Sequence, residues 1–481
     1  MQSAPPPPFT IQTSVKRALA DTVTPVSIYL RLRAKFPETM LLESADYRGT
    51  DNSFSYICCM PFAHLTLNNG TFVEELPDGS SESRSVESYR AEGESPVQKA
   101  LERFAGRFSA APAAPLPAGV INGMFGYLAF DAIENIEDIK LQAKQVAHEA
   151  IPQLRYSVFR YVLAINHFKD EIYFLENSCA RDQRTTAVDI AALAFCGEVK
   201  PGSFHATGAE ESNLSDEAHV ELINKCKRHI FRGDVFQIVP SRKFMQRFEG
   251  DDFNVYRALR SLNPSPYLFY FDYGSYHIFG SSPEAELVVK GSQASIHPIA
   301  GTYRRSGDET EDLKAASRLL DDPKESAEHV MLVDLARNDL SIHCYPVAVD
   351  RFKEVQLYSH VIHLVSKVSG TLKAGESSIA VLTSTFPAGT LSGAPKYKAL
   401  QLIDSYEPSR RHFYGGALGF IGFNGDINHA IMIRSFLSKD GILCSQAGSG
   451  IVADSVPETE VAEVRHKLGA LKAAVKMAEE L

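Results

Sequence analysis

Strand-like and helix-like segments are grouped along this chain instead of alternating one for one, and this grouping limits its fold more than any other feature. Short strands joined by polar turns fill the first half, where Asn69-Gly70 is a strong signal for a two-residue hairpin turn. Segments 155–166 and 171–175 predict a second hairpin, and the helical signals sharpen from Ser215 onward. A doubly wound parallel sheet needs strands and helices to alternate, so the sequence favours the α+β class.

Three polar or small-residue stretches predict how the chain is divided. Residues 78–95 are rich in Ser and Glu and residues 110–118 are rich in Ala and Pro, so both predict loops or linkers. Residues 198–214 are rich in Gly, Ser and Thr and mark a boundary between two halves. We therefore expect an N-terminal region at 1–210 and a C-terminal region at 211–481.

Charge and composition exclude several kinds of protein. The 481 residues include 49 Lys and Arg against 59 Asp and Glu, so the formal net charge is −10. This acidic balance offers no basic surface for nucleic acid or an anionic membrane, and no apolar stretch approaches the roughly 18 residues of a membrane span. The seven cysteines include no Cys-x-x-Cys pair and the N-terminus has no signal-like apolar segment, so we expect a cytoplasmic protein without a disulfide framework.

Two acidic helix starts are candidates for binding a metal ion. Asp322-Pro-Lys-Glu325 and Ser455-Val-Pro-Glu458 each combine an N-capping residue with a proline in the first turn. Each start is associated with two glutamates three residues apart on one helix face; the pairs are Glu325 with Glu328 and Glu460 with Glu463. Like charges at this spacing cost about 0.2–0.5 kcal/mol per pair, and Mg²⁺ prefers carboxylate oxygens as ligands. The duplication therefore indicates a Mg²⁺ site, with the alternative that the acidic residues only complement the helix dipoles.

Three further features have two interpretations each. Gly448-Ser-Gly450 matches part of a dinucleotide-binding loop, but an apolar run follows where a helix has to open, which favours a strand-end turn that offers N–H groups to a carboxylate. His363 lies in an apolar strand, where a structural histidine is the commoner finding. Arg434 is flanked by strand hydrophobics and needs an anionic partner, either a structural Asp or Glu or a substrate carboxylate.

Five motifs in the second half, taken together, resemble those of the chorismate-utilising enzymes. They are Ser281-Ser-Pro-Glu284, Pro298-Ile-Ala-Gly-Thr302, the segment from Glu325 to Asp339, Phe386-Pro-Ala-Gly-Thr-Leu-Ser-Gly-Ala-Pro-Lys396 and the segment from Pro457 to Lys467. Within that family the set is most similar to the component I group of anthranilate synthases. The resemblance implies large, mostly antiparallel sheets packed with helices, a regulatory N-terminal region and a chorismate-binding C-terminal region.

The resemblance also implies a reaction and its residues. In that reaction ammonia adds to C2 of chorismate, the C4 hydroxyl leaves, and elimination of pyruvate gives anthranilate. Glu284 corresponds to the general acid at the C4 hydroxyl, and His363 to the base at C2. Glu328 and Glu463 correspond to ligands of a Mg²⁺ ion that grips the ring carboxylate, with the other glutamate of each pair beside them. Thr390 is grouped with the catalytic residues. The other residues placed around the substrate are Gly301, Thr302, Tyr414, Arg434, Gly448, Ser449 and Gly450.

A regulatory site and a partner subunit follow from the same resemblance. The residues in segments similar to the tryptophan feedback site are Ser44, Pro266, Tyr267 and Leu268, so tryptophan is expected as an inhibitor. Nothing in the chain resembles a glutamine amidotransferase, and ammonia from glutamine therefore requires a second subunit. The arginine that usually follows Gly-Thr in the family is Tyr303 here, which leaves the local anion contacts open.

Two positions bear on which product forms. Related isochorismate and salicylate synthases carry a lysine that activates water at the position of Gln237. Para-aminobenzoate synthases commonly carry a nucleophilic lysine at the position of Ala300. Neither side chain present here has that chemistry, which favours anthranilate. The alternatives are component I of a para-aminobenzoate synthase and a regulatory subunit that binds chorismate or tryptophan without catalysis.

Overall fold

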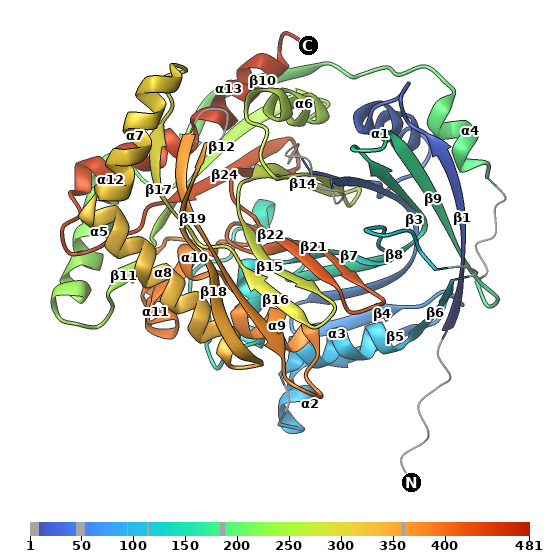
Figure 1. The fold of residues 1–481 in the computed structure, drawn as a ribbon, viewed down its shortest axis with the longest axis horizontal. Coiled ribbons are helices and arrows are strands. Elements are labelled where there is room, and N and C mark those ends of the chain that lie inside the picture. Colours follow the sequence, from blue (N-terminus) through green and yellow to red (C-terminus); the bar gives the residue numbers. More distant parts are fainter. Residues whose placement is uncertain (1–8, 45–52, 94, 113–114, 183–187, 358–360) are drawn as a thin grey trace.

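The computed structural model describes residues 9–44, 53–93, 95–112, 115–182, 188–357 and 361–481 (Figure 1). The strands up to residue 212 are β1 (Phe9–Leu19), β2 (Met40–Glu43), β3 (Phe54–Asn68), β4 (Thr71–Glu75), β5 (Ser81–Ser85), β6 (Phe108–Pro112), β7 (Gly123–Leu128), β8 (Leu154–Asn166), β9 (Glu171–Cys179) and β10 (Phe204–Ser212). The later strands are β11 (Gln237–Ile238), β12 (Ser241–Gly250), β13 (Tyr267–Asp272), β14 (Tyr276–Ser282), β15 (Ala285–Lys290), β16 (Gln293–Ile296), β17 (Ile299–Arg304), β18 (Cys344–Leu357), β19 (Val361–Leu372), β20 (Gly393–Ala394), β21 (Ala417–Gly422), β22 (Ile427–Ile431), β23 (Ser435–Lys439) and β24 (Ile442–Gly448).

Helices pack around these strands. The α-helices are α1 (Pro25–Arg33), α2 (Val86–Ala91), α3 (Pro96–Gly106), α4 (Ile190–Phe195), α5 (Asp216–Phe231), α6 (Phe253–Leu262), α7 (Glu309–Asp321), α8 (Pro323–Ser341), α9 (Ser378–Thr385), α10 (Gly389–Ser392), α11 (Lys396–Tyr406), α12 (Pro457–Lys467) and α13 (Gly469–Ala478). Two 3₁₀ helices are η1 (Phe130–Asn135) and η2 (Ala147–Glu149). Within the described residues, no helix has the length and apolar composition needed to cross a membrane.

Two arms of antiparallel sheet extend from the long paired strands β3 and β8. The first, which we call the β15 arm, runs β8–β7–β21–β22–β15–β16–β19, and β19 also pairs with β17 and β18. The second, the β14 arm, runs β3–β2–β13–β14–β23–β24–β12–β10. Helices α7 and α8 lie along β17, β18 and β19 at the far end of the β15 arm (Figure 1). These mostly antiparallel arms with helices outside them confirm the α+β class.

Strands from the two halves of the sequence share the same arms. Strand β2 pairs with β13, and β7 pairs with β21, so the ladder continues across the boundary near residue 210. Buried residues of both halves also meet in common apolar clusters, one of which joins Tyr29 of α1 to Phe253 of α6 at a ring distance of 4.8 Å. The division into a regulatory region at 1–210 and a catalytic region at 211–481 stays a prediction about function.

Local signals account for several elements. The Asn69-Gly70 turn joins β3 to β4, and Gly274, with a φ of 76°, turns between β13 and β14. Helix α5 begins where Ser215 accepts a hydrogen bond from the Ala218 N–H, and it buries Ile223 on its apolar face. These turns and the Ser215 cap are fixed by neighbouring residues, so the sequence predicted them.

The sequence prediction missed strands in polar segments at the edges of the sheet. Residues 78–95 hold β5 and α2 instead of only a loop, the stretch 110–118 begins inside β6, and residues 198–214 hold β10. Strand β5 pairs with β4 alone among the described strands and alternates between exposed and half-buried residues. Edge strands carry polar side chains that discourage pairing with other chains, and their composition therefore resembles that of a loop.

One helix start differs from the prediction, and the C-terminal helical stretch contains a break. Helices α12 and α13 are separated at Leu468 and Gly469, because glycine weakens a helix interior. Val456 is the N-cap residue of α12, and Ser455 instead accepts a hydrogen bond from the Val452 N–H. In contrast, Asp322 caps α8 as predicted, since its carboxylate accepts from the Glu325 N–H at 3.2 Å.

Candidate active site

The chain crosses between the two sheet arms at two adjacent points, and both points carry residues named from the sequence. Glu284 lies between β14 and β15, and Arg434 lies between β22 and β23. The two crossings are joined by backbone hydrogen bonds, from Ser281 N–H to Arg434 O and from Ile431 N–H to Glu284 O, each 3.0 Å long. Arg434 has a φ of 51°, in the left-handed region that a side chain of this size rarely adopts. Such strain is found where surrounding structure holds a functional side chain in place.

Glu284 is a buried carboxyl group whose environment favours its neutral form. It is 8% exposed, and its Oε1 accepts a hydrogen bond of 3.1 Å from Thr390 Oγ1, which α10 brings into the junction. Burial raises the pKa of Glu284 to about 8, against the smaller lowering effects of Thr390 and Lys467. A carboxyl group that keeps its proton near pH 7 has the property of a general acid.

His363 lies on β19 of the β15 arm, and its environment favours the unprotonated form. Its Nδ1–H donates to Gly301 O over 2.8 Å, an orientation that leaves the lone pair on Nε2. Burial lowers the pKa of His363, and nearby Arg434 lowers it further, so the imidazole is neutral around pH 7. Thr302 follows Gly301 in β17, opposite His363 in the ladder, and its side chain lies outside the described set.

Close packing at Gly301 brings helix α8 against β17. Gly301 has a φ of 70°, and a Cβ atom there would lie 2.8 Å from Leu319 Cδ1 and 3.1 Å from Glu325 Oε2. A side chain at this position would therefore collide with α7 and push away the first glutamate of α8. The preceding residue, Ala300, is buried and carries no nucleophile. Tyr303, the departure from the family pattern, donates a hydrogen bond of 3.2 Å to Asp322, the N-cap residue of α8.

Glu328, the second glutamate of α8, lies close to the segment that follows β24. Gln237 Nε2 on β11 donates to Glu328 Oε1 at 3.1 Å. A Cβ atom added to Gly450 would lie 2.5 Å from Gln237 Nε2 and 3.3 Å from Glu328 Oε1, so only glycine lets these groups approach the backbone. Ser449 beside it is fully buried, and its Oγ has no hydrogen-bond partner among the described residues. A ligand oxygen is a suitable partner for such a hydroxyl.

Helix α12 brings the second glutamate pair to this same segment. Glu463 forms an ion pair of 2.7 Å with Lys467, whose Nζ also donates to Gly448 O at 2.9 Å. Arg434 donates to the carbonyl oxygen of Lys467, and burial lowers the pKa of Arg434. Glu460, one turn earlier, is buried. Glu328 of α8 therefore lies beside Gly450, and Glu463 of α12 is linked to Gly448 through Lys467. No helix opens at these glycines.

Tyr414 lies on the segment between α11 and β21, which is held from several sides. Burial raises the pKa of Tyr414 to about 12, and the Gly448 backbone hydrogen-bonds the tyrosine. The fully buried Arg411 forms an ion pair with Glu407 and donates to Leu391 O of α10 at 2.7 Å. A buried charge of this kind holds position only when its donors are satisfied. Arg411 therefore ties the tyrosine segment to the helix that carries Thr390.

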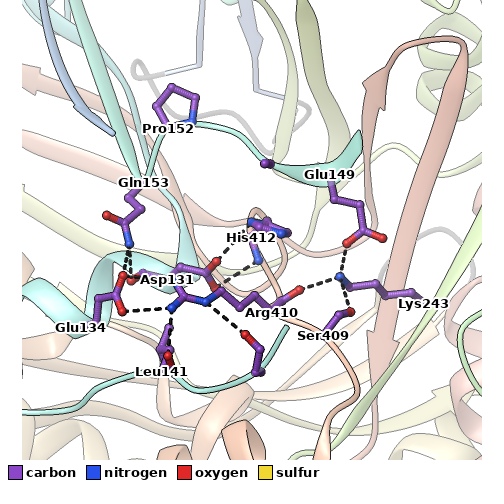
Figure 2. Close-up of polar contacts among 12 residues, drawn as sticks. Asp131, Glu134, Leu141, Glu149, Pro152, Gln153, Lys243, Ser409, Arg410 and His412 are labelled. Carbon is purple, nitrogen blue, oxygen red and sulfur yellow. Dashed lines mark hydrogen bonds and ion pairs between the residues drawn. The ribbon is translucent and has the colours of Figure 1, made fainter. Parts of the chain in front are cut away.

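Residues of the N-terminal half also contribute contacts that hold the segment 407–416, which carries Tyr414 (Figure 2). Lys243 of β12 donates to Glu149 of η2 and to Arg410 O at 2.6 Å. Asp131 of η1 accepts from the His412 N–H at 3.2 Å and lies 3.2 Å from His412 Nδ1. The candidate site therefore depends on both halves of the sequence.

The four residues named for tryptophan binding line one cavity, separate from these groups. Its volume is about 810 Å³, and its lining residues include Ser44, Pro266, Tyr267 and Leu268. Strand β2 pairs with β13 at its wall, where Leu268 lies opposite Glu43. The far end of β15, at Val289 and Lys290, also lines this cavity, whereas its near end adjoins Glu284.

Sequence reasoning missed residues whose importance depends on contacts between distant segments. Lys467 joins Glu463, Gly448 and Arg434, and the only local signal was its spacing of four residues from Glu463. Glu286 is a buried carboxyl group two residues after Glu284, and no pattern in the sequence distinguished it. Within the described residues, no three His, Cys, Asp or Glu side chains gather closely enough to hold a metal ion by themselves.

Comparison with known proteins agrees with these observations. A family model described as chorismate binding enzyme matches residues 49–473. The chain belongs to this family. Relatives named anthranilate synthase component 1 include those of Neisseria meningitidis, 37% identical over 97% of this chain and 95% of the relative, and Geobacillus stearothermophilus, 36% identical over 97% and 94%. The relative from Mycobacterium bovis is 34% identical over 97% of this chain and 93% of its own.

Solved structures extend the similarity to the fold. Anthranilate synthase component I of Streptococcus pneumoniae matches with a TM-score of 0.71 and 28% identity, over 95% of this chain and 99% of that one. The menaquinone-specific isochorismate synthase of Escherichia coli matches with a TM-score of 0.73 over 98% and 96%, but at 17% identity it shows the fold alone. The chain is thus a chorismate-utilising enzyme, which confirms the family expected from the five motifs.

Proposed function

We propose that this enzyme converts chorismate and ammonia to anthranilate and pyruvate, the first committed step of tryptophan synthesis. The observation that carries the proposal is that an acid, Glu284, and a base, His363, both lie close to the crossing that carries Arg434. Glu284 holds a proton near neutral pH, and His363 holds a lone pair. A binding-only protein needs neither an acid nor a base, so this pair argues against the regulatory alternative.

Each residue has one task in this reaction. Glu284 gives its proton to the departing C4 hydroxyl, with Thr390 fixing the carboxyl group by its hydrogen bond. His363 takes the proton from C2 as pyruvate leaves. Arg434 and Tyr414 bind the enolpyruvyl carboxylate, because a guanidinium offers a forked pair of donors to a carboxylate. The Gly448–Gly450 turn lines the substrate with its backbone and with the Ser449 hydroxyl.

The glutamates of α8 and α12 fit a Mg²⁺ ion. Glu328 and Glu463 supply only oxygen, and the missing Cβ of Gly450 leaves a cradle beside Glu328 Oε1. Mg²⁺ is usually bound by one or two protein carboxylates, with water and substrate completing the shell. When bound, the ion would supply positive charge to the ring carboxylate. Glu325 and Glu460 lie beside these ligands.

Gln237 and Ala300 support anthranilate over the other family products. The Gln237 amide donates to Glu328 and has no lone pair basic enough to activate water, so the hydroxylated product is disfavoured. Ala300 offers no amine to attack the ring, so nitrogen enters at C2 from free ammonia. Para-aminobenzoate synthase component I is the closest alternative, and its product differs in the position of the nitrogen.

Regulation and ammonia supply belong to the same proposal. The 810 Å³ cavity at Ser44 and Pro266–Leu268 is large enough for a tryptophan molecule, and β15 runs from its wall to Glu284. Tryptophan bound there would act from a separate site, which is allosteric inhibition. Relatives named component 1 imply a second component, which we propose is a glutamine amidotransferase.

Product identification tests the proposal. The protein is incubated with chorismate, Mg²⁺ and ammonium, and the products are separated by chromatography. We expect anthranilate and pyruvate in equal amounts, and anthranilate from glutamine only after an amidotransferase subunit is added. Chiefly isochorismate, salicylate or 4-amino-4-deoxychorismate would refute the arguments from Gln237 and Ala300, and no turnover would favour the regulatory alternative.

A further inference from the structure

A second buried carboxyl group, that of Glu286, shares a pocket with Glu284. The ladder between β15 and β22 advances two residues in β15, from Ala285 to Leu287, while β22 advances one. Glu286 is therefore the extra residue of a β-bulge, a feature that redirects a side chain. Glu284 and Glu286 both line a cavity of about 30 Å³, which has room for roughly one or two water molecules.

The surroundings of Glu286 do not compensate a negative charge. Its side chain is 3% exposed, and among the described residues neither carboxyl oxygen has a hydrogen-bond partner of regular geometry, although the Ala388 backbone N–H approaches it. An ionised carboxylate in such a place loses its hydration without replacement. Burial raises the pKa of Glu286 to about 8, the same value as that of Glu284.

Three charged or titratable groups face Glu286 from the elements packed against it. They are Lys396 of α11, Asp339 of α8 and Glu284 itself. Lys396 lowers the pKa of Glu286 but less than burial raises it, and its Nζ donates to Asp339 Oδ2 at 2.9 Å and to Thr385 O at 2.7 Å instead of to Glu286. Glu284 and, to a smaller extent, Asp339 raise the pKa of Glu286 by repulsion. Because a Coulomb energy belongs to both partners, ionisation of either glutamate disfavours ionisation of the other.

We propose that Glu286 is a positioning residue that keeps Glu284 protonated around neutral pH by forming a coupled carboxyl pair with it. The inference rests on the proposed role of Glu284 as the general acid. In that step the O–H bond of Glu284 breaks, a new O–H bond forms on the departing oxygen, and the hydroxyl leaves as water. The carboxylate left behind shares the pocket with Glu286, so the pair takes a proton back from water instead of remaining charged.

The pH dependence of kcat tests this role through E286Q, which keeps the shape and removes the acid. Loss of the repulsion lets Glu284 ionise at lower pH, so the alkaline limb of kcat should move down by about one pH unit. That shift corresponds to a fall of about eight-fold at about pH 8.5 and to little change at about pH 6.5. The KM for chorismate should stay the same, because Glu286 does not touch the substrate.

Two further variants separate this effect from a structural one. E286D restores a carboxyl group and should return the alkaline limb toward that of the wild type. E102Q makes the same chemical change on α3, where Glu102 accepts hydrogen bonds from Gln98 and Ser377, and should leave the limb unmoved. An alkaline limb of folded E286Q that coincides with the wild-type limb would overturn the proposal.

Infrared titration of the protein without chorismate gives an answer independent of turnover. The carboxyl band that E284Q removes reports Glu284, and its titration midpoint should be lower in E286Q than in the wild type. Equal midpoints would overturn the coupled pair even if anthranilate is formed, whereas a shifted midpoint without turnover would leave the pair intact and refute the proposed function. If E286Q does not fold, the wild type decides: coupled groups lose their protons in two separated steps, and independent groups with equal midpoints lose them in one.

Discussion

Glutamate side chains lie in two contrasting environments, one in the Glu284 pocket and the other near the Gly448–Gly450 turn. Glu284 is buried, has a hydroxyl partner and a second carboxyl group in its cavity, and its pKa is raised to about 8. Glu328 and Glu463 instead contact an amide and an ammonium group beside a glycine turn. The same residue type can therefore favour a neutral acid in one place and a charged carboxylate in another, depending only on its neighbours.

A third region shows what a cation does to a buried acid. Asp252 is at least as buried as Glu284, and burial is the largest single effect on it, yet its pKa is lowered because His277, whose Nδ1 lies 2.8 Å from the carboxylate, acts together with hydrogen bonds from Ser438 and Tyr270. Tyr270 donates to Asp252 at 2.6 Å. At Asp252 the charged and hydroxyl partners together outweigh burial, whereas Thr390 and Lys467 do not outweigh it at Glu284.

The largest effect is expected from E284Q. The amide keeps the size of the side chain and its contact with Thr390 but has no proton to give, so turnover of chorismate should fall by about 10²–10⁴-fold. Initial rates at saturating Mg²⁺ and ammonium measure the loss. E102Q serves as the matched control, and activity within a few-fold of wild type in E284Q would mean that another group protonates the hydroxyl.

E463Q is expected to lose somewhat less, about 100-fold at low Mg²⁺. The substitution removes one of two carboxylate charges at the turn while the fold is retained, which circular dichroism checks. Part of the loss should be recovered at high Mg²⁺, a rescue that E284Q should not show. Full activity of E463Q in the presence of a chelator would contradict a metal site at Glu463.

A smaller effect, about ten-fold, is expected on tryptophan inhibition in S44F. The phenyl ring fills part of the 810 Å³ cavity, so the inhibition constant should rise, measured as the ratio of rates with and without tryptophan in each variant. Because the chain contains no Trp, the emission of added tryptophan reports binding directly. Unchanged emission on adding wild-type protein, together with unchanged inhibition of S44F, would place the regulatory site elsewhere.

The smallest effect concerns stability at His277. Burial alone would lower its pKa, but Asp252 and Asp272 raise it to about 10. Since this folded value lies above the unfolded one of about 6.5, the stabilisation is complete below pH 6.5 and is lost as the pH rises toward 10. The free energy of unfolding of wild type should exceed that of H277N by about 2 kcal/mol at pH 6, and the excess should shrink by pH 10. A constant difference in urea unfolding across that range would refute this assignment.

The sequence predicted the parts of the fold and site that depend on neighbouring residues. The Asn69-Gly70 turn and the Asp322 cap of α8 are local, and the cap already placed Glu325 and Glu328 on one face. Strand β10 was missed because an edge strand is as polar as a loop.

Features that depend on distant contacts were not predictable from pattern alone. The bulge at Glu286 exists only because β22 lies beside β15, and the role of Lys467 exists only because α12 returns to the end of β24. The sequence placed Arg434 in a strand, whereas the structure places it at a crossing between sheet arms, where a backbone carbonyl group receives its hydrogen bond.

Calorimetric titration of Mg²⁺ in the presence of chorismate, with E284Q and E463Q side by side, tests most directly the division of labour between the two environments. The account predicts that E284Q binds Mg²⁺ as tightly as wild type although it does not turn over chorismate. E463Q should bind Mg²⁺ at least about ten-fold more weakly. Equal Mg²⁺ affinity in E463Q and wild type, or loss of Mg²⁺ binding in E284Q, would contradict it.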